Sequence, residues 1–489
     1  MRPVLPFLHS VFASPLTQLA GVVALYSLPG FFFLRNFRVT DPDIWWHLAT
    51  GRWILQHHAI PRTDPFSTYG IGKAWIVYSW LFDIFVQLLH RQFGFVGIVL
   101  YDVAVRLAIT IALFHLVKTL FPSVWYAIAL TAMGIFAMNL ILGPRPGMLT
   151  ILFTIIELNL ILSARRTGLT KKLWLLPFML LLWANWHIQF VYGLLLLGIF
   201  ATLPLLPPLW QKTIAAREIS FSKQLWLVLL AGFFATLINP FGPRVYSTVF
   251  QYMHQPKSYS LIVELRAITF REPGQFVALF LVLFAAAAIG WRREKNLLWP
   301  VLLLLASFLA FRSVKEIWFL VVISLCALSD GWNVKSLSDY RARIPRSQTI
   351  TCVWVLAILV VGFRRYDVSN AWLEMQVAGH FPEVAAQYIE KHHLPGPLFN
   401  DFNWGGFLIW RLPELPVSMD GRTNVQGDER VAHFSAVWNG KPEWATDEEL
   451  QHANVILAKK DSALAAILRL DPRFKLVYDD IQAQVFTRR

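Results

Sequence analysis

Apolar residues in this chain gather into long blocks separated by short polar segments, as in proteins whose helices cross a membrane. Eleven such blocks are present. They cover residues 18–34, 95–117, 124–142, 147–163, 173–184, 188–206, 225–239, 276–290, 297–311, 316–329 and 349–363. Several blocks are shorter than the roughly 17 residues that a span prefers. We therefore predict a polytopic α-helical membrane protein with about eleven spans, the first of them an uncleaved N-terminal span.

A polar and aromatic segment, residues 35–94, follows the first block and permits two topologies. Its run 75–89 either crosses the membrane or lies on the outer surface as an amphipathic helix. The second choice places five consecutive basic loops on the cytoplasmic side, as the positive-inside rule requires. These loops carry Lys118, then Arg165, Arg166, Lys171 and Lys172, then Lys212, Arg217 and Lys223, then Arg292, Arg293 and Lys295, and finally Lys335, Arg341, Arg343 and Arg346. We therefore predict a cytoplasmic N-terminus and a transmembrane domain over 1–368, with interfacial helices in its outer loop 35–94.

The composition changes after about residue 368, and no further apolar block follows. Helical and extended patterns then alternate, which predicts a C-terminal α/β domain over 369–489. The predicted elements are helices at 382–392, 405–412 and 462–470, strands at 397–400, 417–420 and 454–458, and two closing strands around Asp479 and Asp480. The odd number of spans places this domain outside the membrane, in the extracytoplasmic space.

Composition narrows the class of protein further. Of the 489 residues, 56% are hydrophobic and only 15% are charged, and the mean hydropathy is +0.50. These values exclude a soluble globular protein, a disordered chain and a coiled coil. The net charge of +14 would suggest a nucleic-acid partner in a soluble protein. Basic cytoplasmic loops account for it here, so we predict no nucleic-acid binding. Cys326 and Cys352 both lie in apolar blocks and support neither a disulfide framework nor a metal cluster.

Two carboxylates separated by one proline, Asp41 and Asp43, follow the first span directly. Such a pair suits a divalent cation such as Mg²⁺ or Mn²⁺, which prefers oxygen ligands. It also suits a general base acting on a hydroxyl group. The alternative is structural, because Asp43 precedes an apolar-periodic stretch and an aspartate there commonly caps a helix.

Other polar residues of the predicted outer loops are candidates for substrate binding. They are His47, Asp64, Arg145, His187, Glu264, Arg312 and Lys315. Outer basic residues run against the positive-inside bias, and an anionic ligand such as a lipid phosphate would explain them. Contact with lipid headgroups or snorkelling from a span end is the alternative. For Asp64, which precedes Pro65, turn initiation is the alternative.

Three acidic residues elsewhere have mainly structural interpretations. Asp102 and Arg106 are four residues apart within a span and are expected to pair with each other. Glu157, also within a span, is either functional or hydrogen-bonded to a neighbouring helix. Asp420 and Arg422 flank Gly421 after a predicted strand and suggest an ion pair that fixes the domain, with a binding site as the alternative.

Taken together, these segments resemble the GT-C integral membrane glycosyltransferases, and within them a bacterial subgroup. The resemblance rests on residues 41–51 with 61–65, on 239–242, and on 403–406 with 420–422, and it covers nearly the whole chain. It implies transfer of a sugar from a polyprenyl-phosphate donor to an acceptor at the outer face of a bacterial cytoplasmic membrane. It also implies that Asp41 or Asp43 lies near the metal or the acceptor, and that Arg145, Arg312 and Lys315 lie near the lipid phosphate.

Two other classes of function remain open at this point. A transporter or flippase for a lipid-linked substrate would have broken helices and charge at mid-membrane. A non-catalytic scaffold would bind a partner or a glycan through its outer domain. The partners expected on the preferred interpretation are membrane lipids, the polyprenyl-phosphate sugar donor and an acceptor that the sequence does not identify.

Overall fold

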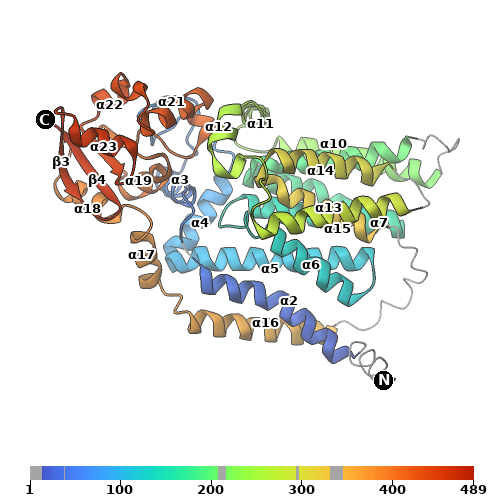
Figure 1. Cartoon of the computed structure of the whole chain (residues 1–489). Coiled ribbons are helices and arrows are strands. Elements are labelled where there is room, and N and C mark those ends of the chain that lie inside the picture. Colours follow the sequence, from blue (N-terminus) through green and yellow to red (C-terminus); the bar gives the residue numbers. More distant parts are fainter. Residues whose placement is uncertain (1–13, 38, 207–215, 293–296, 331–344) are drawn as a thin grey trace.

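The structure, a computed structural model, describes residues 14–37, 39–206, 216–292, 297–330 and 345–489. It consists of a bundle of roughly parallel and antiparallel helices with a small α/β domain at one end (Figure 1). We call this the domain end of the bundle and the opposite one the basic end.

Each apolar block of the sequence corresponds to one bundle helix. These helices are α2 (Pro15–Asn36), α5 (Phe95–Leu120), α6 (Val124–Met138), α7 (Gly147–Thr167), α8 (Leu176–Trp186), α9 (Val191–Thr202), α10 (Ala216–Thr236), α13 (Pro273–Trp291), α14 (Leu298–Arg312), α15 (Ile317–Ser329) and α16 (Pro345–Arg365). Among the described residues, six are long and apolar enough to cross a membrane, namely α2, α5, α7, α10, α13 and α16. The polytopic helical architecture is therefore confirmed, whereas the count of eleven spans stays a prediction.

The outward faces of the bundle are apolar. Large side chains such as Phe178 on α8 and Leu304 on α14 are 74% and 72% exposed, and Trp354 on α16 is 59% exposed. Contiguous exposed apolar surface of this kind is rare on soluble proteins and suits the hydrocarbon of a bilayer.

The predicted basic loops that the structure describes meet at the basic end. Arg166 donates hydrogen bonds to the last carbonyls of α5 and pairs with Asp330 after α15, at 2.7 Å. Arg217 bonds the carbonyl of Arg165, and Arg292 bonds a carbonyl of α15. These loops therefore share one side of the bundle. Several predicted basic residues lie outside the described residues, namely Lys212, Arg293, Lys295, Lys335, Arg341 and Arg343.

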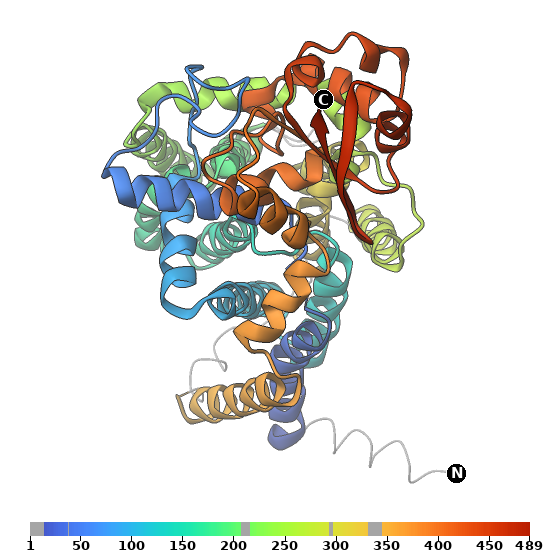
Figure 2. The ribbon, with the colours of Figure 1, turned by 90° about the vertical axis from the view of Figure 1, so that its left-hand side faces the viewer.

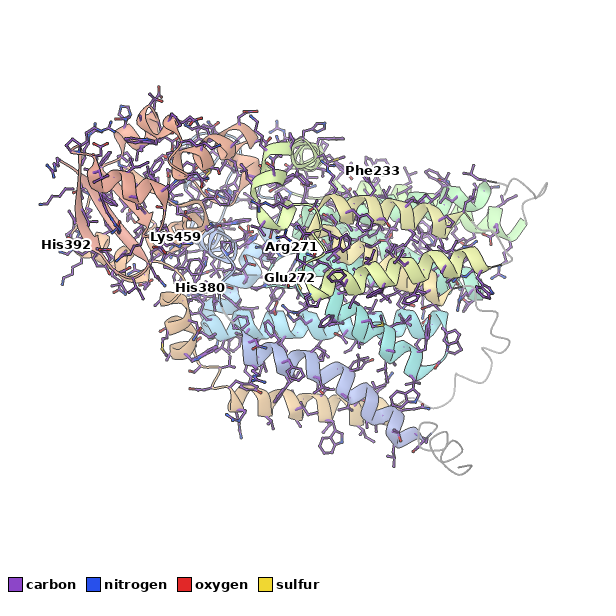
Figure 3. All side chains as sticks on the ribbon, viewed as in Figure 1. Phe233, Arg271, Glu272, His380, His392 and Lys459 are labelled. Carbon is purple, nitrogen blue, oxygen red and sulfur yellow. The ribbon has the colours of Figure 1, made fainter. Side chains whose placement is uncertain are left out.

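Short helices cover the domain end. In Figure 2, which looks onto this end, α3 (Ile44–His57) and α4 (Trp80–Phe93) run across bundle helices that are seen end-on. Helices α11 (Val245–Met253) and α12 (Pro256–Leu261) lie at the same end (Figure 1). The labelled side chains of Arg271 and Glu272 mark this end where α13 begins (Figure 3).

The predicted helix 75–89 begins too early, because α4 starts only at Trp80. Trp75 belongs to the preceding loop instead. Its backbone N–H donates to the carbonyl of Arg62 at 2.9 Å, and its side chain is 3% exposed. Trp75 is apolar because it is buried in a loop and not because it belongs to a helix. The start of the apolar run in the sequence therefore did not mark the start of the helix.

The C-terminal region is a small mixed α/β domain. Its four-stranded sheet has the order β1 (Leu398–Asn400), β2 (Val455–Lys459), β4 (Ala483–Arg488) and β3 (Phe474–Asp479). Strand β1 is parallel to β2, and β4 is antiparallel to both of its neighbours. The helices are α17 (Asn370–Ala378), α18 (Glu383–Lys391), α19 (Gly405–Arg411), α20 (Thr423–Gln426), α21 (Asp428–Trp438), α22 (Glu448–His452) and α23 (Ala463–Leu470).

The predicted strand 417–420 was wrong. Among the described residues, Val417 forms only isolated bridges, one to Ser67 in the loop between α3 and α4 and one to Leu398 in β1. Its extended backbone thus joins the membrane domain to the α/β domain instead of extending the sheet.

Helix α3 is embedded in the α/β domain through Trp45. This side chain is fully buried, and its ring packs edge-on against Phe381 and Phe407, with centroids 5.1 Å away in both cases. Burial of an aromatic ring among others is worth several kcal/mol, since truncating one to alanine typically costs about 3–5 kcal/mol. Helix α3 and the α/β domain therefore form one packed unit over the domain end.

Candidate functional site

The segment after the first span places two carboxylates at the start of α3. The Oδ1 atom of Asp41 accepts the backbone N–H of Asp43 at 2.9 Å, an aspartate turn that fixes the loop across Pro42. Asp43 occupies the N-cap position of α3, yet its side chain makes no capping hydrogen bond. The capping interpretation of Asp43 therefore does not describe its side chain, which faces other charged groups.

Five charged residues from four segments meet there, and we call them the charged cluster. They are Asp41, Asp43, Arg145, Glu264 and Lys315. Arg145 lies at their centre. Its Nε contacts Asp41 Oδ2 at 2.5 Å, and its Nη1 contacts Asp43 Oδ2 at 3.4 Å and also pairs with Glu264. Lys315 Nζ lies 3.2 Å from the other oxygen of Glu264.

The environment of the cluster shifts the pKa values of two of its carboxyl groups in opposite directions. Burial raises the pKa of Asp43 to about 6; Arg145 opposes the shift and the negative charges of Asp41 and Glu264 support it. Burial acts on Glu264 too, but Lys315 and Arg145 together lower its pKa to about 2. Glu264 in turn raises the pKa of Lys315. At neutral pH, Glu264 and Lys315 are therefore firmly ionised, whereas Asp43 is poised to take up a proton.

The two aspartates differ in how strongly their oxygens are engaged. Asp41 holds a short charge-assisted bond to Arg145 and the N–H of Asp43, and its side chain is 12% exposed. Asp43 has only long contacts, 3.4 Å to Arg145 and 3.4 Å from Trp46 Nε1, and it is 24% exposed. The carboxylate of Asp43 is thus the more available of the two.

The α/β domain closes over Asp43 through glycines. A Cβ atom on Gly421 would lie 2.5 Å from Asp43 Oδ1, and one on Gly406 would lie 2.5 Å from the carbonyl oxygen of Pro42. The neighbour of Gly406 is fixed backbone, so only glycine permits this approach, whereas the neighbour of Gly421 is a carboxylate oxygen that a rotation of the Asp43 side chain would move away. This explains why glycine occupies position 406.

Aromatic and imidazole groups border the cluster. The hydroxyl groups of Tyr78 and Tyr252 are 3.0 Å apart, and burial raises the pKa of both, with the charge of Asp43 contributing. Nδ1 of His187 lies 2.8 Å from the hydroxyl of Thr150. Burial and the nearby charge of Lys315 lower the pKa of His187 to about 3, so its imidazole is neutral. These groups offer uncharged hydrogen-bonding partners beside the charges.

The charged cluster does not fit a divalent cation as it stands. The guanidinium of Arg145 contacts Asp41, Asp43 and Glu264 and thus takes the position between the carboxylates where a cation would bind. Within the described ranges, no group of three histidine, cysteine or acidic side chains is arranged to hold a metal ion. Metal ligation by Asp41 and Asp43 therefore stays a prediction from sequence, and we derive no chemical step through a metal.

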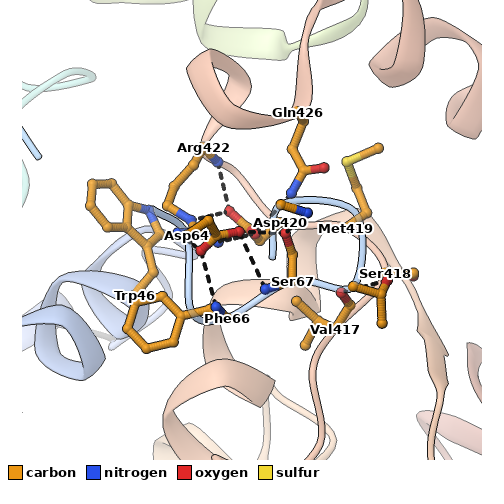
Figure 4. A network of polar contacts seen from close by, with 12 residues as sticks. Trp46, Asp64, Phe66, Ser67, Val417, Ser418, Met419, Asp420, Arg422 and Gln426 are labelled. Atoms are coloured by element: carbon orange, nitrogen blue, oxygen red, sulfur yellow. Dashed lines mark hydrogen bonds and ion pairs between the residues drawn. The ribbon is translucent and has the colours of Figure 1, made fainter. Parts of the chain in front are cut away.

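Asp64 lies in a different network, which joins the loop between α3 and α4 to the α/β domain (Figure 4). Arg422 donates from Nη1 and Nη2 to the two oxygens of Asp64, at 2.7 and 3.3 Å, and pairs with Asp420 at 2.7 and 2.8 Å. Asp64 also accepts the hydroxyl of Ser67 at 2.5 Å. All its oxygens are therefore engaged, in line with the structural interpretation of the Asp420–Arg422 pair.

The remaining predicted site residues lie outside the charged cluster. His47, one turn along α3, is buried with Nδ1 2.5 Å from Asp83 of α4. Burial lowers the pKa of His47 and raises that of Asp83, so neither readily carries its charge. Arg312 is exposed and stacks over the ring of Tyr259, with 4.7 Å between its Cζ and the centroid. His47 thus fixes α3 on α4, and Arg312 lies at the surface of α14.

The sequence alone did not reveal which residues that are far apart in the chain contact each other. The contact between Asp64 and Arg422 joins residues 358 positions apart, and no local pattern reports it. Tyr252 likewise had no signal, because α11 reads as an ordinary amphipathic helix. Arg62 donates a hydrogen bond to the carbonyl of Pro240 at 2.7 Å. Both residues lie in segments on which the family resemblance rests, so the sequence did offer a signal for this contact.

Comparisons with known proteins show a shared fold. No family model matches the chain, and no curated protein matches it. Among solved structures, the apo oligosaccharyltransferase of Archaeoglobus fulgidus matches with a TM-score of 0.51 and 11% identity, over 92% of this chain and 70% of that one. The archaeal oligosaccharyltransferase AglB of that organism, in complex with an inhibitory peptide and a dolichol-phosphate, matches with 0.52 and 13%, over 90% and 69%. The arabinofuranosyltransferase AftD from Mycobacteria gives a TM-score of 0.45 and 13% identity, over 96% and 40%.

The two oligosaccharyltransferase structures match almost the whole of this chain, including both the bundle and the α/β domain. At these identities the likeness establishes architecture alone. The chain is thus a polytopic helical membrane protein with a GT-C-like fold and a small C-terminal α/β region.

Proposed function

We propose that this protein is a membrane glycosyltransferase that takes a sugar from a polyprenyl-phosphate donor and transfers it to an acceptor hydroxyl at the outer face of the membrane. The observation that carries the proposal is the charged cluster. It brings an available carboxylate, Asp43, and two cations, Arg145 and Lys315, together at the domain end of a GT-C-like bundle.

Asp43 is the proposed base. The acceptor oxygen attacks the anomeric carbon, the bond from that carbon to the phosphate oxygen breaks, and Asp43 takes the proton of the acceptor hydroxyl. A general base works best when its pKa lies near the operating pH, and burial brings the pKa of Asp43 to about 6. The weak engagement of its oxygens leaves them free to accept that proton.

Lys315 and Arg145 are the proposed partners of the leaving phosphate. Charge develops on the phosphate oxygen as the bond breaks, and fixed cations in a buried setting stabilise it. Lys315 has one ion-pair partner among the described residues, Glu264, and its ammonium group carries three donors. It is therefore the better placed of the two to bind a phosphate, whereas Arg145 chiefly holds the carboxylates in position.

Two further observations support a lipid-linked donor. The charged cluster lies at the domain end of helices that are long and apolar enough to span a bilayer, where the head of a membrane lipid would lie. One structure with the same fold is described in complex with a dolichol-phosphate. A non-catalytic scaffold gives no reason for a carboxyl group with a raised pKa beside two cations.

The test is cleavage of the donor by purified protein. We would supply a panel of polyprenyl-phosphate sugars in proteoliposomes and measure release of polyprenyl phosphate by wild type, Asp43→Asn and Asp471→Asn. Asp471 pairs with Arg473 on the α/β domain, away from the cluster, and provides the matched control. We expect Asp43→Asn to lose a factor of about 10²–10⁴, the usual contribution of a general base.

Equal turnover by Asp43→Asn and wild type at equal expression would remove Asp43 from the mechanism. Absence of turnover with every donor in wild type, together with retained binding of a glycan or partner, would favour the scaffold.

A further inference from the structure

A cavity of about 810 Å³ lies between the bundle helices α2, α5 and α6, and Leu359 of α16 also lines it. Its volume falls within the range of sites that bind small molecules. The walls are chiefly apolar and aromatic, and representative residues are Leu25, Phe32, Leu107, Ile128 and Ala132. Because α2, α5 and α16 are long and apolar enough to cross a bilayer, its natural occupant is hydrocarbon from the membrane.

The cavity also has a polar part, formed by Arg106, Asn36, Asn139 and Thr110. Arg106 is tied to Asp102 by an Nε–Oδ2 contact of 2.6 Å and also donates to Asn139 and to the carbonyl of Leu142, at 3.3 and 2.5 Å. A guanidinium has five N–H donors, so these three bonds leave two. Within the part of the chain that the structure describes, Asp102 Oδ1 is buried without a hydrogen-bond partner.

The polar part lies beside the charged cluster. Leu142, which accepts a hydrogen bond from Arg106, precedes Arg145 by three residues in the loop between α6 and α7. Tyr101, on the same helix as Arg106, donates to the carbonyl of Arg145 at 3.1 Å. A lipid with its chain in the cavity would therefore pass Arg106 and present its phosphate next to Arg145.

We propose that this cavity binds the isoprenoid chain of a polyprenyl phosphate, with Arg106 and Asn139 at the end of the cavity nearest the charged cluster and the phosphate beyond them, at Arg145 and Lys315. The proposed function supplies the identity of the chain, and in that respect the inference rests on it.

The first test is lipid binding by variants that fill the cavity. Ala132→Phe on α6 places a ring in the cavity, and Ala286→Phe on α13 adds the same ring to an exposed face elsewhere in the bundle. We would titrate each protein, in phosphatidylcholine nanodiscs, with a polyprenyl phosphate of one chain length and count bound lipids by native mass spectrometry. We expect at least a tenfold loss of affinity for Ala132→Phe and none for Ala286→Phe.

The second test uses wild type alone, so that it remains decisive even where Ala132→Phe fails to fold. A photoreactive group at the far end of the polyprenyl chain should cross-link to peptides of α2, α5 or α6. Phosphatidylglycerol should compete poorly.

Cross-links confined to other helices, or undiminished binding by a folded Ala132→Phe, would overturn the inference and leave the proposed function standing. Equal competition by phosphatidylglycerol would also overturn it, because the cavity would then bind membrane lipids in general. If wild type bound no polyprenyl phosphate at all, both the inference and the proposed function would fail.

Discussion

Replacing Asp64 by asparagine should weaken the attachment of the α/β domain to the membrane domain. Asp64 and Asp420 are the two carboxylates that face the buried guanidinium of Arg422, and all three side chains are at most 1% exposed. The substitution keeps the size of the side chain but removes one negative charge. Arg422 then lies buried with only Asp420 as an ionic partner.

The magnitude follows from burial. Removing one partner of a buried ion pair typically costs about 3–5 kcal/mol, because the remaining charge is left without compensation. Asp420 keeps its two contacts with Arg422, at 2.7 and 2.8 Å. We therefore expect Asp64→Asn to lower the free energy of unfolding by about 3 kcal/mol, the lower end of that range.

The chain contains a matched control with the same Asp-x-Arg spacing. Asp471 pairs with Arg473 at 2.6 Å; the carboxylate is 8% exposed, but the arginine side chain is 37% exposed and therefore hydrated. A pair with one solvent-exposed partner is worth about 0–1 kcal/mol, so Asp471→Asn should lower the free energy of unfolding by at most about 1 kcal/mol. The assay is thermal unfolding in detergent followed by tryptophan fluorescence, with limited proteolysis of the segment between α16 and α17. Equal unfolding temperatures and equal cleavage for the two variants would refute the assignment of Arg422 as the link between the domains.

Three further predictions concern the cluster and its surroundings. Donor cleavage should fall about tenfold per pH unit below about pH 6, because the base form of Asp43 is lost there; a flat profile from pH 5 to 7 would exclude Asp43 as the titrating base. Gly406→Ala should lower the free energy of unfolding by about 1–3 kcal/mol, since the new Cβ would meet the carbonyl oxygen of Pro42. Gly290→Ala on α13 is the control, because a Cβ there would point into open space and should not lower the unfolding temperature. Chelation of divalent cations should leave donor cleavage unchanged, because the guanidinium of Arg145 already occupies the position between the carboxylates, and restoration of a lost activity by Mg²⁺ or Mn²⁺ would contradict this.

The architecture was largely predictable from sequence because membrane hydrocarbon imposes a simple rule. Every span must be a long apolar helix, so apolar blocks map directly onto α2, α5 and their neighbours. Local pairs were equally accessible: Asp102 and Arg106, four residues apart on α5, form the expected ion pair. Helix boundaries between α2 and α5 could not be predicted, as the late start of α4 shows. Packing against the α/β domain decides them, and sequence periodicity does not.

The site was predictable only as a set of residues on one side of the membrane. The structure brings Asp41, Asp43, Arg145, Glu264 and Lys315 together, but their roles depend on distances that spacing cannot report. The sequence did not show which of the two aspartates is the better candidate for the base. The contacts of Arg145 distinguish them, because it bonds Asp41 at 2.5 Å and lies 3.4 Å from Asp43. Two residues with the same polar signal in the sequence lie outside the charged cluster: Asp64 pairs with Arg422, and His47 with Asp83.

The most direct test of the central claim is the identity of the lipids that stay bound to the purified protein. Mass spectrometry would compare wild type with Lys315→Ala and with Lys460→Ala, whose ammonium pairs with Asp479 on the far α/β domain. A phosphate held by Lys315 predicts polyprenyl-phosphate species on wild type and Lys460→Ala, and their depletion from Lys315→Ala. Ordinary phospholipids alone, in equal amounts on all three proteins, would contradict the assignment of the charged cluster as a lipid-phosphate site.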